Sequence, residues 1–145
     1  MDSADEVLED FAAHPDASVT IGAGTEHWER GETTLTIHGD GRAEVHNRAS
    51  GAERQFEGRL DPPRVAELGR DLVRLGLTSL QPHPGDRRPG DVPVWVAVER
   101  AGETLHESTL WHGDRYEDSG LDGVLQRYQR IVEELTDGEL PFGGG

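Results

Sequence analysis

Seven histidines are the side chains of this chain best suited to acid–base or metal chemistry. No two of them have the His-x-x-x-His or His-Glu-x-x-His spacing that brings two imidazoles to one face of a helix. The chain also has no cysteine, which excludes thiolate ligands and thiol catalysis. We therefore expect surface histidines, with no catalytic residue, no metal site and no cofactor. The seven are His14, His27, His38, His46, His83, His106 and His112.

Other catalytic signatures are also missing. The sequence lacks the Gly-x-Ser-x-Gly turn of serine hydrolases and the glycine-rich Walker loop of phosphate-binding proteins. Gly22-Ala23-Gly24 begins like a dinucleotide-binding loop, but no helix with a third glycine follows it. We expect no enzyme activity, and the alternative is a small metal-dependent hydrolase that uses His38, His46 or His106.

Trp95 is the aromatic residue whose position favours binding to a partner. Valines alternate with other residues over 92–98, a pattern that predicts a strand with the valines on one face. Trp95 then lies on the opposite face, where we expect Ala97 and His106 as its neighbours. An exposed indole in a chain with 6% aromatic residues is a typical anchor for a protein partner. The alternative is that the N-terminal helix covers it.

The charge is strongly negative and concentrated at both ends. The chain has 14 arginines and no lysine against 29 acidic residues, a formal charge of −15 at pH 7. Residues 1–29 hold eight acids and no arginine, and residues 117–145 hold seven acids and two arginines. This balance opposes binding to nucleic acid or to anionic lipid. It suits solvated ends or docking on a basic protein, and acidic mimicry of nucleic acid is a further alternative.

The first residues predict a short helix with one apolar face. Ser3-Ala4-Asp5-Glu6 has the form of a capping box, and His14-Pro15 ends the helical stretch. Val7, Leu8 and Phe11 fall on one face at helical spacing. Because so short a helix is marginal alone, these three side chains pack either on this domain or on another protein. We take them as candidate partner-binding residues.

A long proline-rich loop supplies the other basic candidates. Residues 81–93 contain four prolines, and loops of this length are usually functional or disordered. Arg87 and Arg88 in this loop are candidate partner-binding residues.

Alternating residues predict the central strands and their register. A three-residue loop at 39–41 pairs Ile37 with Ala43 and keeps the apolar residues on one face, with Gly41 in the left-handed position. Residues 53–58 form another expected strand. An even loop at 101–102 places Val98 opposite Leu105, which also sets Trp95 opposite Ser108.

Two longer helices complete the expected fold. Asp61 and Pro62 begin a helix over about 62–75, which ends at Gly76. Asp118 or Ser119 caps the last helix, which ends at Gly138. The predicted class is α+β: an antiparallel sheet of five to six strands, two amphipathic helices on one face, and the short N-terminal helix. We expect an acidic N-terminal arm over 1–16, one domain over 17–138 and a flexible glycine-rich tail over 139–145.

The order of turns and strands resembles a known bacterial family. Thr34–Glu44 forms a hairpin, Gly58-Arg59-Leu60-Asp61-Pro62 opens a helix, and Asp91-Val92-Pro93 opens a strand. Together with a glycine turn and a last leucine-rich helix, this string resembles a family of small uncharacterised α+β domains. It is more distantly similar to emfourin-type metallopeptidase inhibitors. The likeness covers roughly 33–135. The first family implies no activity, and the second implies peptidase inhibition.

The sequence thus favours a noncatalytic protein-binding module, such as an inhibitor, an immunity-type partner or an adaptor. We expect it to act through an exposed face of the sheet, the 81–93 loop and the acidic ends. The expected partner is another protein, either a basic one or a protease. The acidic start has no apolar signal segment, and no apolar run reaches about 18 residues, so we expect a cytoplasmic protein without a membrane span.

Overall fold

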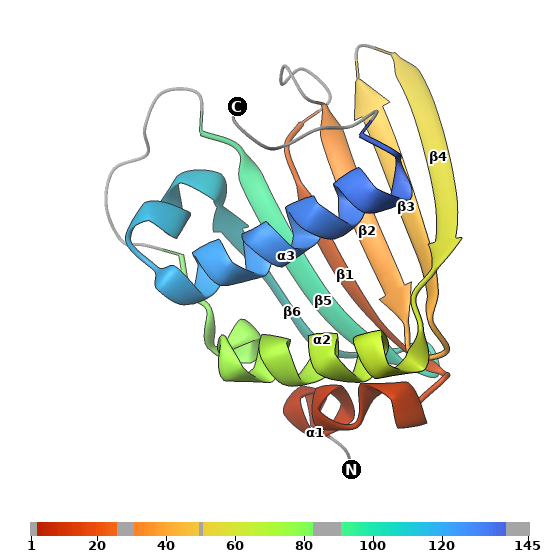
Figure 1. Ribbon diagram of the computed structural model, residues 1–145. Helices are drawn as coiled ribbons and strands as arrows, with labels where there is room; N and C mark the ends of the chain where they lie inside the picture. Colours follow the sequence, from red (N-terminus) through yellow and green to blue (C-terminus); the bar gives the residue numbers. More distant parts are fainter. Residues whose placement is uncertain (1–2, 26–30, 50, 83–90, 139–145) are drawn as a thin grey trace.

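The computed structural model describes residues 3–25, 31–49, 51–82 and 91–138. Six strands form one antiparallel sheet in the order β4-β3-β2-β1-β5-β6 (Figure 1). This sheet, with its helices on one side, confirms the predicted α+β class. The strands are β1 (Ala17–Ala23), β2 (Glu32–His38), β3 (Arg42–Ala49), β4 (Ala52–Arg59), β5 (Pro93–Arg100) and β6 (Glu103–Trp111).

Helices cover one face and one end of this sheet. In Figure 1, α3 runs diagonally across the face, and α2 lies near one end of the strands with α1 against it. None of the helices in the described part of the chain is long and apolar enough to cross a membrane. The helices are α1 (Ala4–Glu9), α2 (Pro62–Arg74) and α3 (Ser119–Leu135), with short 3-10 segments η1 (Phe11–Ala13), η2 (Leu77–Ser79) and η3 (His112–Tyr116).

The β2–β3 hairpin has the predicted register. Ile37 pairs with Ala43 and Leu35 pairs with Val45, so the apolar side chains share one face. Gly41 closes the turn with a φ of 97°, a left-handed conformation that glycine adopts without a steric penalty. The alternation of apolar and polar residues was therefore sufficient to define this hairpin.

The β5–β6 hairpin differs from the prediction by one residue. Val98 pairs with His106 and Trp95 pairs with Thr109, because a bulge between Val98 and Glu99 adds an unpaired residue on β6. The predicted pairs of Val98 with Leu105 and of Trp95 with Ser108 are wrong. As a result, His106 lies on the face of the valines and not beside Trp95.

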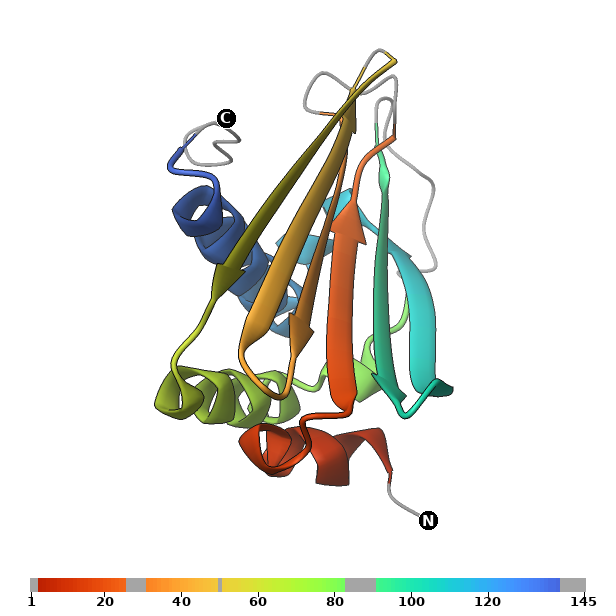
Figure 2. The same ribbon diagram turned by 90° about the vertical axis from the view of Figure 1, so that its right-hand side faces the viewer.

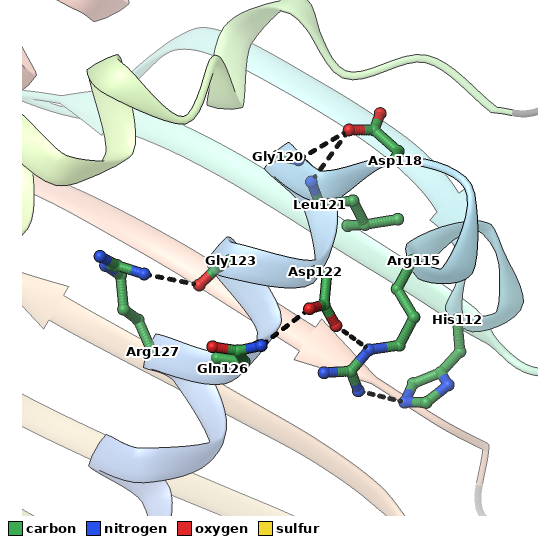
Figure 3. Close-up of polar contacts among 9 residues, drawn as sticks. All are labelled: His112, Arg115, Asp118, Gly120, Leu121, Asp122, Gly123, Gln126 and Arg127. Atoms are coloured by element: carbon green, nitrogen blue, oxygen red, sulfur yellow. Dashed lines mark hydrogen bonds and ion pairs between the residues drawn. The ribbon is translucent and has the colours of Figure 1, made fainter.

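Helix α2 begins and ends at its expected signals, whereas α3 begins at its expected cap and ends at Leu135, before the predicted Gly138. Pro62 occupies the first turn of α2 after Asp61, and Gly76 ends it with a φ of 77°. The Asp118 carboxylate accepts hydrogen bonds from the backbone N–H groups of Gly120 (2.9 Å) and Leu121 (3.2 Å) and so caps α3 (Figure 3).

Helix α1 is part of the main core. Val7, Leu8 and Phe11 are each 0% exposed and belong to the same apolar cluster as the sheet valines. A β-carbon on Gly69 of α2 would lie 2.1 Å from the Leu8 carbonyl oxygen, so the two helices touch through their backbones. The three apolar side chains pack on this domain, which was the first of the two alternatives. They present no surface to a partner, and α1 is no separate arm.

One polar group network is enclosed in the core. The Tyr128 hydroxyl on α3 donates a 2.7 Å hydrogen bond to the backbone carbonyl of Thr33, and the Asn47 amide donates a 2.8 Å bond to the Thr33 hydroxyl. Burial raises the pKa of Tyr128, which keeps its hydroxyl protonated as a donor. The network fixes α3 against β2 and β3.

Candidate functional site

The face of the sheet opposite α2 and α3 is the candidate functional surface. Figure 2 shows the strands with α3 to one side, and no described helix lies over the opposite face. We call this surface the open face. Its residues follow the cross-strand pairs of the sheet, since directly paired side chains point the same way. One row across all six strands is Thr109, Trp95, Gly22, Thr34, His46 and Gln55.

The Trp95 ring packs against the neighbouring strand β1 in this row. A β-carbon built on Gly22 would lie 2.2 Å from two carbons of the indole ring and 2.5 Å from its nitrogen, so the ring occupies the space a side chain would fill. The Trp95 residue is nevertheless only partly buried. One side of the ring therefore packs on the backbone of β1 and the rest remains accessible to a partner.

The surroundings of Trp95 are polar on one side and acidic on the other. Thr20, in the adjacent row, shares a hydroxyl–hydroxyl hydrogen bond of 3.3 Å with Thr36. Glu107 pairs with Ala97, next to Trp95 along β5, and Glu99 follows on the same face. In the part of the chain that the structure describes, neither carboxylate has an ion-pair partner. Glu107 thus lies diagonally across from Trp95, and Glu99 lies four residues further along β5 on the same side; both carboxylates are exposed.

The β3–β4 half of the open face differs because two of its carboxylates, Glu53 and Glu44, have ion-pair partners. Glu53 lies 3.2 Å from the guanidinium of Arg48 and 3.9 Å from the His46 imidazole. Glu44 lies 3.9 Å from both Arg42 and His38. A shallow hollow of about 290 Å³ lies here. It is lined by Thr34, Thr36, Glu44, Val45, His46, Gln55, Phe56 and Glu57.

His106 has no place on the open face. Its side chain lies on the covered side of β6, and its Nε2 is buried without a hydrogen-bond partner, as is the hydroxyl oxygen of Ser108. The prediction that His106 flanks Trp95 is therefore wrong, and the cause is the bulge in β6. No three His, Asp or Glu side chains of the described ranges come together in a way that would hold a metal ion.

The remaining candidates fall into two groups. Arg87 and Arg88 lie outside the described residues. Val7, Leu8 and Phe11 are enclosed in the core and cannot contact a partner in this structure. Of the predicted binding residues that the structure describes, Trp95 alone lies on the open face.

Sequence reasoning missed the residues that define the surroundings of Trp95. Gly22 provides the space for the indole, and a glycine within a strand is a known sign of such a close approach. The wrong β5–β6 register placed Glu107 on the other face, and Glu99 did not stand out among the many other acidic residues. The mid-strand glycine was the available signal, although it does not say which side chain covers it.

Comparisons with known proteins add no relative to this picture. A scan against models of protein families and a search of curated proteins each found no match. The resemblance to the small bacterial α+β domains and to emfourin-type inhibitors stays a prediction.

Proposed function

We propose that this protein is a noncatalytic protein-binding module whose docking surface is the open face around Trp95. An inhibitor, an immunity-type partner or an adaptor all fit this description. The partner is a basic protein that places an arginine or lysine side chain over the indole. The predicted cytoplasmic location belongs to the same proposal.

The observation that carries this proposal is the position of Trp95 with Glu107 diagonally across from it, while Glu99 adds a second negative charge further along β5. An indole attracts a cation to its face, and nearby carboxylates strengthen that attraction. Because Gly22 leaves room for the indole to pack on β1, the ring is already positioned before a partner arrives. Ordering a side chain on binding costs free energy, so a preset ring binds more tightly than a free one.

The charge of the whole chain supports the same kind of partner. A formal charge of −15 attracts basic proteins over a distance set by the ionic strength and repels acidic ones. Charge of this kind mainly raises the rate of association and the specificity. The local contacts at Trp95 would then decide which basic protein remains bound.

Affinity capture with matched variants tests the proposal. Wild type, Trp95→Ala, Glu107→Gln and the control Glu57→Gln are each used as bait at equal concentration in extract of the source cells. Glu57 lies on the open face of β4, away from Trp95, so its variant makes the same chemical change elsewhere.

We expect one basic protein to be retained by wild type and by Glu57→Gln, to be weakened by Glu107→Gln and to be lost by Trp95→Ala. Equal retention by Trp95→Ala and wild type would contradict the proposed surface. The absence of any protein held by wild type in preference to Trp95→Ala would contradict the proposed function.

A further inference from the structure

A groove separates α2 and α3 on the covered side of the molecule, away from the open face. Figure 1 shows the two helices diverging from one end. At that end, β-carbons on Gly120 and Gly123 would lie 2.4 Å and 2.7 Å from atoms of Leu75, so α3 and the end of α2 touch closely. Beyond this contact the groove encloses about 320 Å³, near the lower limit for small-molecule sites of roughly 300 Å³.

Ion pairs join the two helices on either side of this groove. Arg64 near the start of α2 donates two hydrogen bonds of 2.5 Å to the Glu134 carboxylate near the end of α3. Each partner holds the other charged, since this bond raises the pKa of Arg64 and lowers that of Glu134. Further along, Asp71 of α2 accepts a 3.2 Å bond from Arg127 of α3. The order of the pairs shows that the helices run antiparallel.

The two residues of the second pair each make one further hydrogen bond. Arg127 also donates to the Gly123 carbonyl oxygen (3.1 Å), and Asp71 also accepts from Arg74 (2.6 Å). Gln126 at the edge of the groove donates to Asp122 (2.7 Å), as Figure 3 shows. These contacts match the charges of Arg127 and Asp71 within the protein before any ligand binds.

The middle of the groove holds two charges that are not paired. Between the Arg64–Glu134 pair and the Asp71–Arg127 pair, Glu67 of α2 lies at about the level of Arg130 of α3. Both line the groove, yet neither has an ion pair or a hydrogen bond among the described residues. No ion pair joins Glu67 to Arg130 among the described residues, and the Glu67 carboxylate contributes to the raised pKa of Arg64. Buried or nearly buried apolar side chains lie beside them: Leu60, Leu68 and Ile131.

We propose that this groove binds a zwitterionic ligand of the size of an α-amino acid with an apolar side chain. The carboxylate of the ligand would accept hydrogen bonds from the planar guanidinium of Arg130, which suits a carboxylate in two-point contact. Its ammonium group would donate to Glu67. Its side chain would pack on Leu68 and Ile131.

Charge balance favours a zwitterion over a simple anion. Arg64 and Arg127 are already matched by Glu134 and Asp71, which leaves one positive and one negative group in the middle. A phosphate or a plain carboxylate would pair with Arg130, but its negative charge would then be repelled by the nearby Glu67 carboxylate. A ligand with both charges satisfies both groups at once.

A set of three small molecules tests this chemistry. L-leucine carries both charges, N-acetyl-L-leucine lacks the ammonium group and L-leucinamide lacks the carboxylate. Each is titrated into the full-length protein while the backbone amide signals of α2 and α3 are followed by NMR. We expect saturable shifts with L-leucine and affinities lower by about tenfold or more for the other two, the typical effect of losing a charged hydrogen bond.

Two charge-removing variants assign the contacts. Glu67→Gln should remove the preference for L-leucine over N-acetyl-L-leucine, and Arg130→Gln should remove the preference over L-leucinamide. Both side chains are exposed, so neither variant should disturb the fold. Glu57→Gln and Arg54→Gln, both on β4, are the matched controls and should leave the three affinities unchanged.

Three results would overturn the proposal. They are the absence of saturable shifts with L-leucine, equal affinity for L-leucine and N-acetyl-L-leucine, and unchanged preferences in both groove variants. The second result would mean that the groove is a simple anion site. None of these results depends on Trp95, so this inference and the proposed function can fail separately.

Discussion

Strand β5 presents two different surfaces to the two sides of the sheet. Val94, Val96 and Val98 face the helices and are at most 1% exposed. Trp95 and Ala97, between them, face the opposite side and stay partly accessible. The same alternation that builds the core thus also builds a surface that no described element covers. Stability should depend on the covered face, and binding should depend on the open one.

The largest expected effect on stability comes from a substitution that creates a cavity on the covered side of the sheet. Phe11→Ala removes a ring that is 0% exposed, and large-to-small changes of this kind typically cost about 3–5 kcal/mol. We expect a loss of that size in the free energy of unfolding, measured with urea. Glu9→Ala, an exposed change on α1, is the control and should cost little. A loss below about 1 kcal/mol for Phe11→Ala would mean that the N-terminal segment of α1 and η1 is not part of the core.

Gly22→Ala tests the contact that links the open face to the backbone. The added methyl group would overlap the Trp95 ring, and a forced overlap of this kind typically costs about 1–3 kcal/mol. Because the ring would have to leave its position on β1, we also expect a red shift of tryptophan fluorescence and loss of partner binding. Gly51→Ala adds a methyl group where nothing lies within 4 Å; because a φ of 83° strains any L side chain, it is a control for tryptophan emission and partner binding and not for stability. An unchanged emission spectrum in Gly22→Ala would contradict the stacking of Trp95 on Gly22.

Tyr128→Phe gives a smaller effect on the covered side. It removes the hydroxyl that donates to the Thr33 carbonyl and keeps the ring, so we expect a loss of about 1–2 kcal/mol in unfolding free energy. The emission of Trp95 and the binding of a partner should not change. If Tyr128→Phe weakened partner binding as much as Trp95→Ala, the two faces would not be independent.

The smallest effect concerns pH. The pKa of Glu134 is lowered in the folded protein by its hydrogen bonds to Arg64, so this pair stabilises the fold above the unfolded pKa of about 4.3. That contribution is lost as the pH falls through the lowered pKa of the folded state. Because both side chains are substantially exposed, we expect only a modest change. Glu134→Gln should reduce the acid sensitivity of the melting temperature, and an unchanged profile would show that the pair contributes nothing.

The parts of the fold that local patterns determine were predictable. The apolar alternation and Gly41 gave the β2–β3 register, and Asp61, Pro62 and Gly76 marked the limits of α2. The β5–β6 register was not predictable in the same way, because a bulge depends on the packing of both strands and not on the turn alone. That single residue moved His106 to the covered face and brought Thr109 beside Trp95.

The candidate site was predictable only in part. The side of β5 on which Trp95 lies followed from the valine pattern. The close approach of Trp95 to Gly22 joins residues that are distant in the sequence, so no local pattern could reveal it. The N-terminal helix differs, because the sequence showed the helical spacing of Val7, Leu8 and Phe11 but not the surface on which they pack. In the structure that surface includes α2, where Gly69 lies against the backbone of Leu8.

Oxidative footprinting of the complex is the most direct test of the docking surface. The free protein and its complex with the captured basic partner are labelled side by side, and the modification rate of Trp95 is compared with that of Tyr116. Tyr116 is 70% exposed and serves as an internal reference. We predict that complex formation lowers the rate at Trp95 several-fold relative to Tyr116. Equal labelling of Trp95 in the free and bound protein would contradict the central claim.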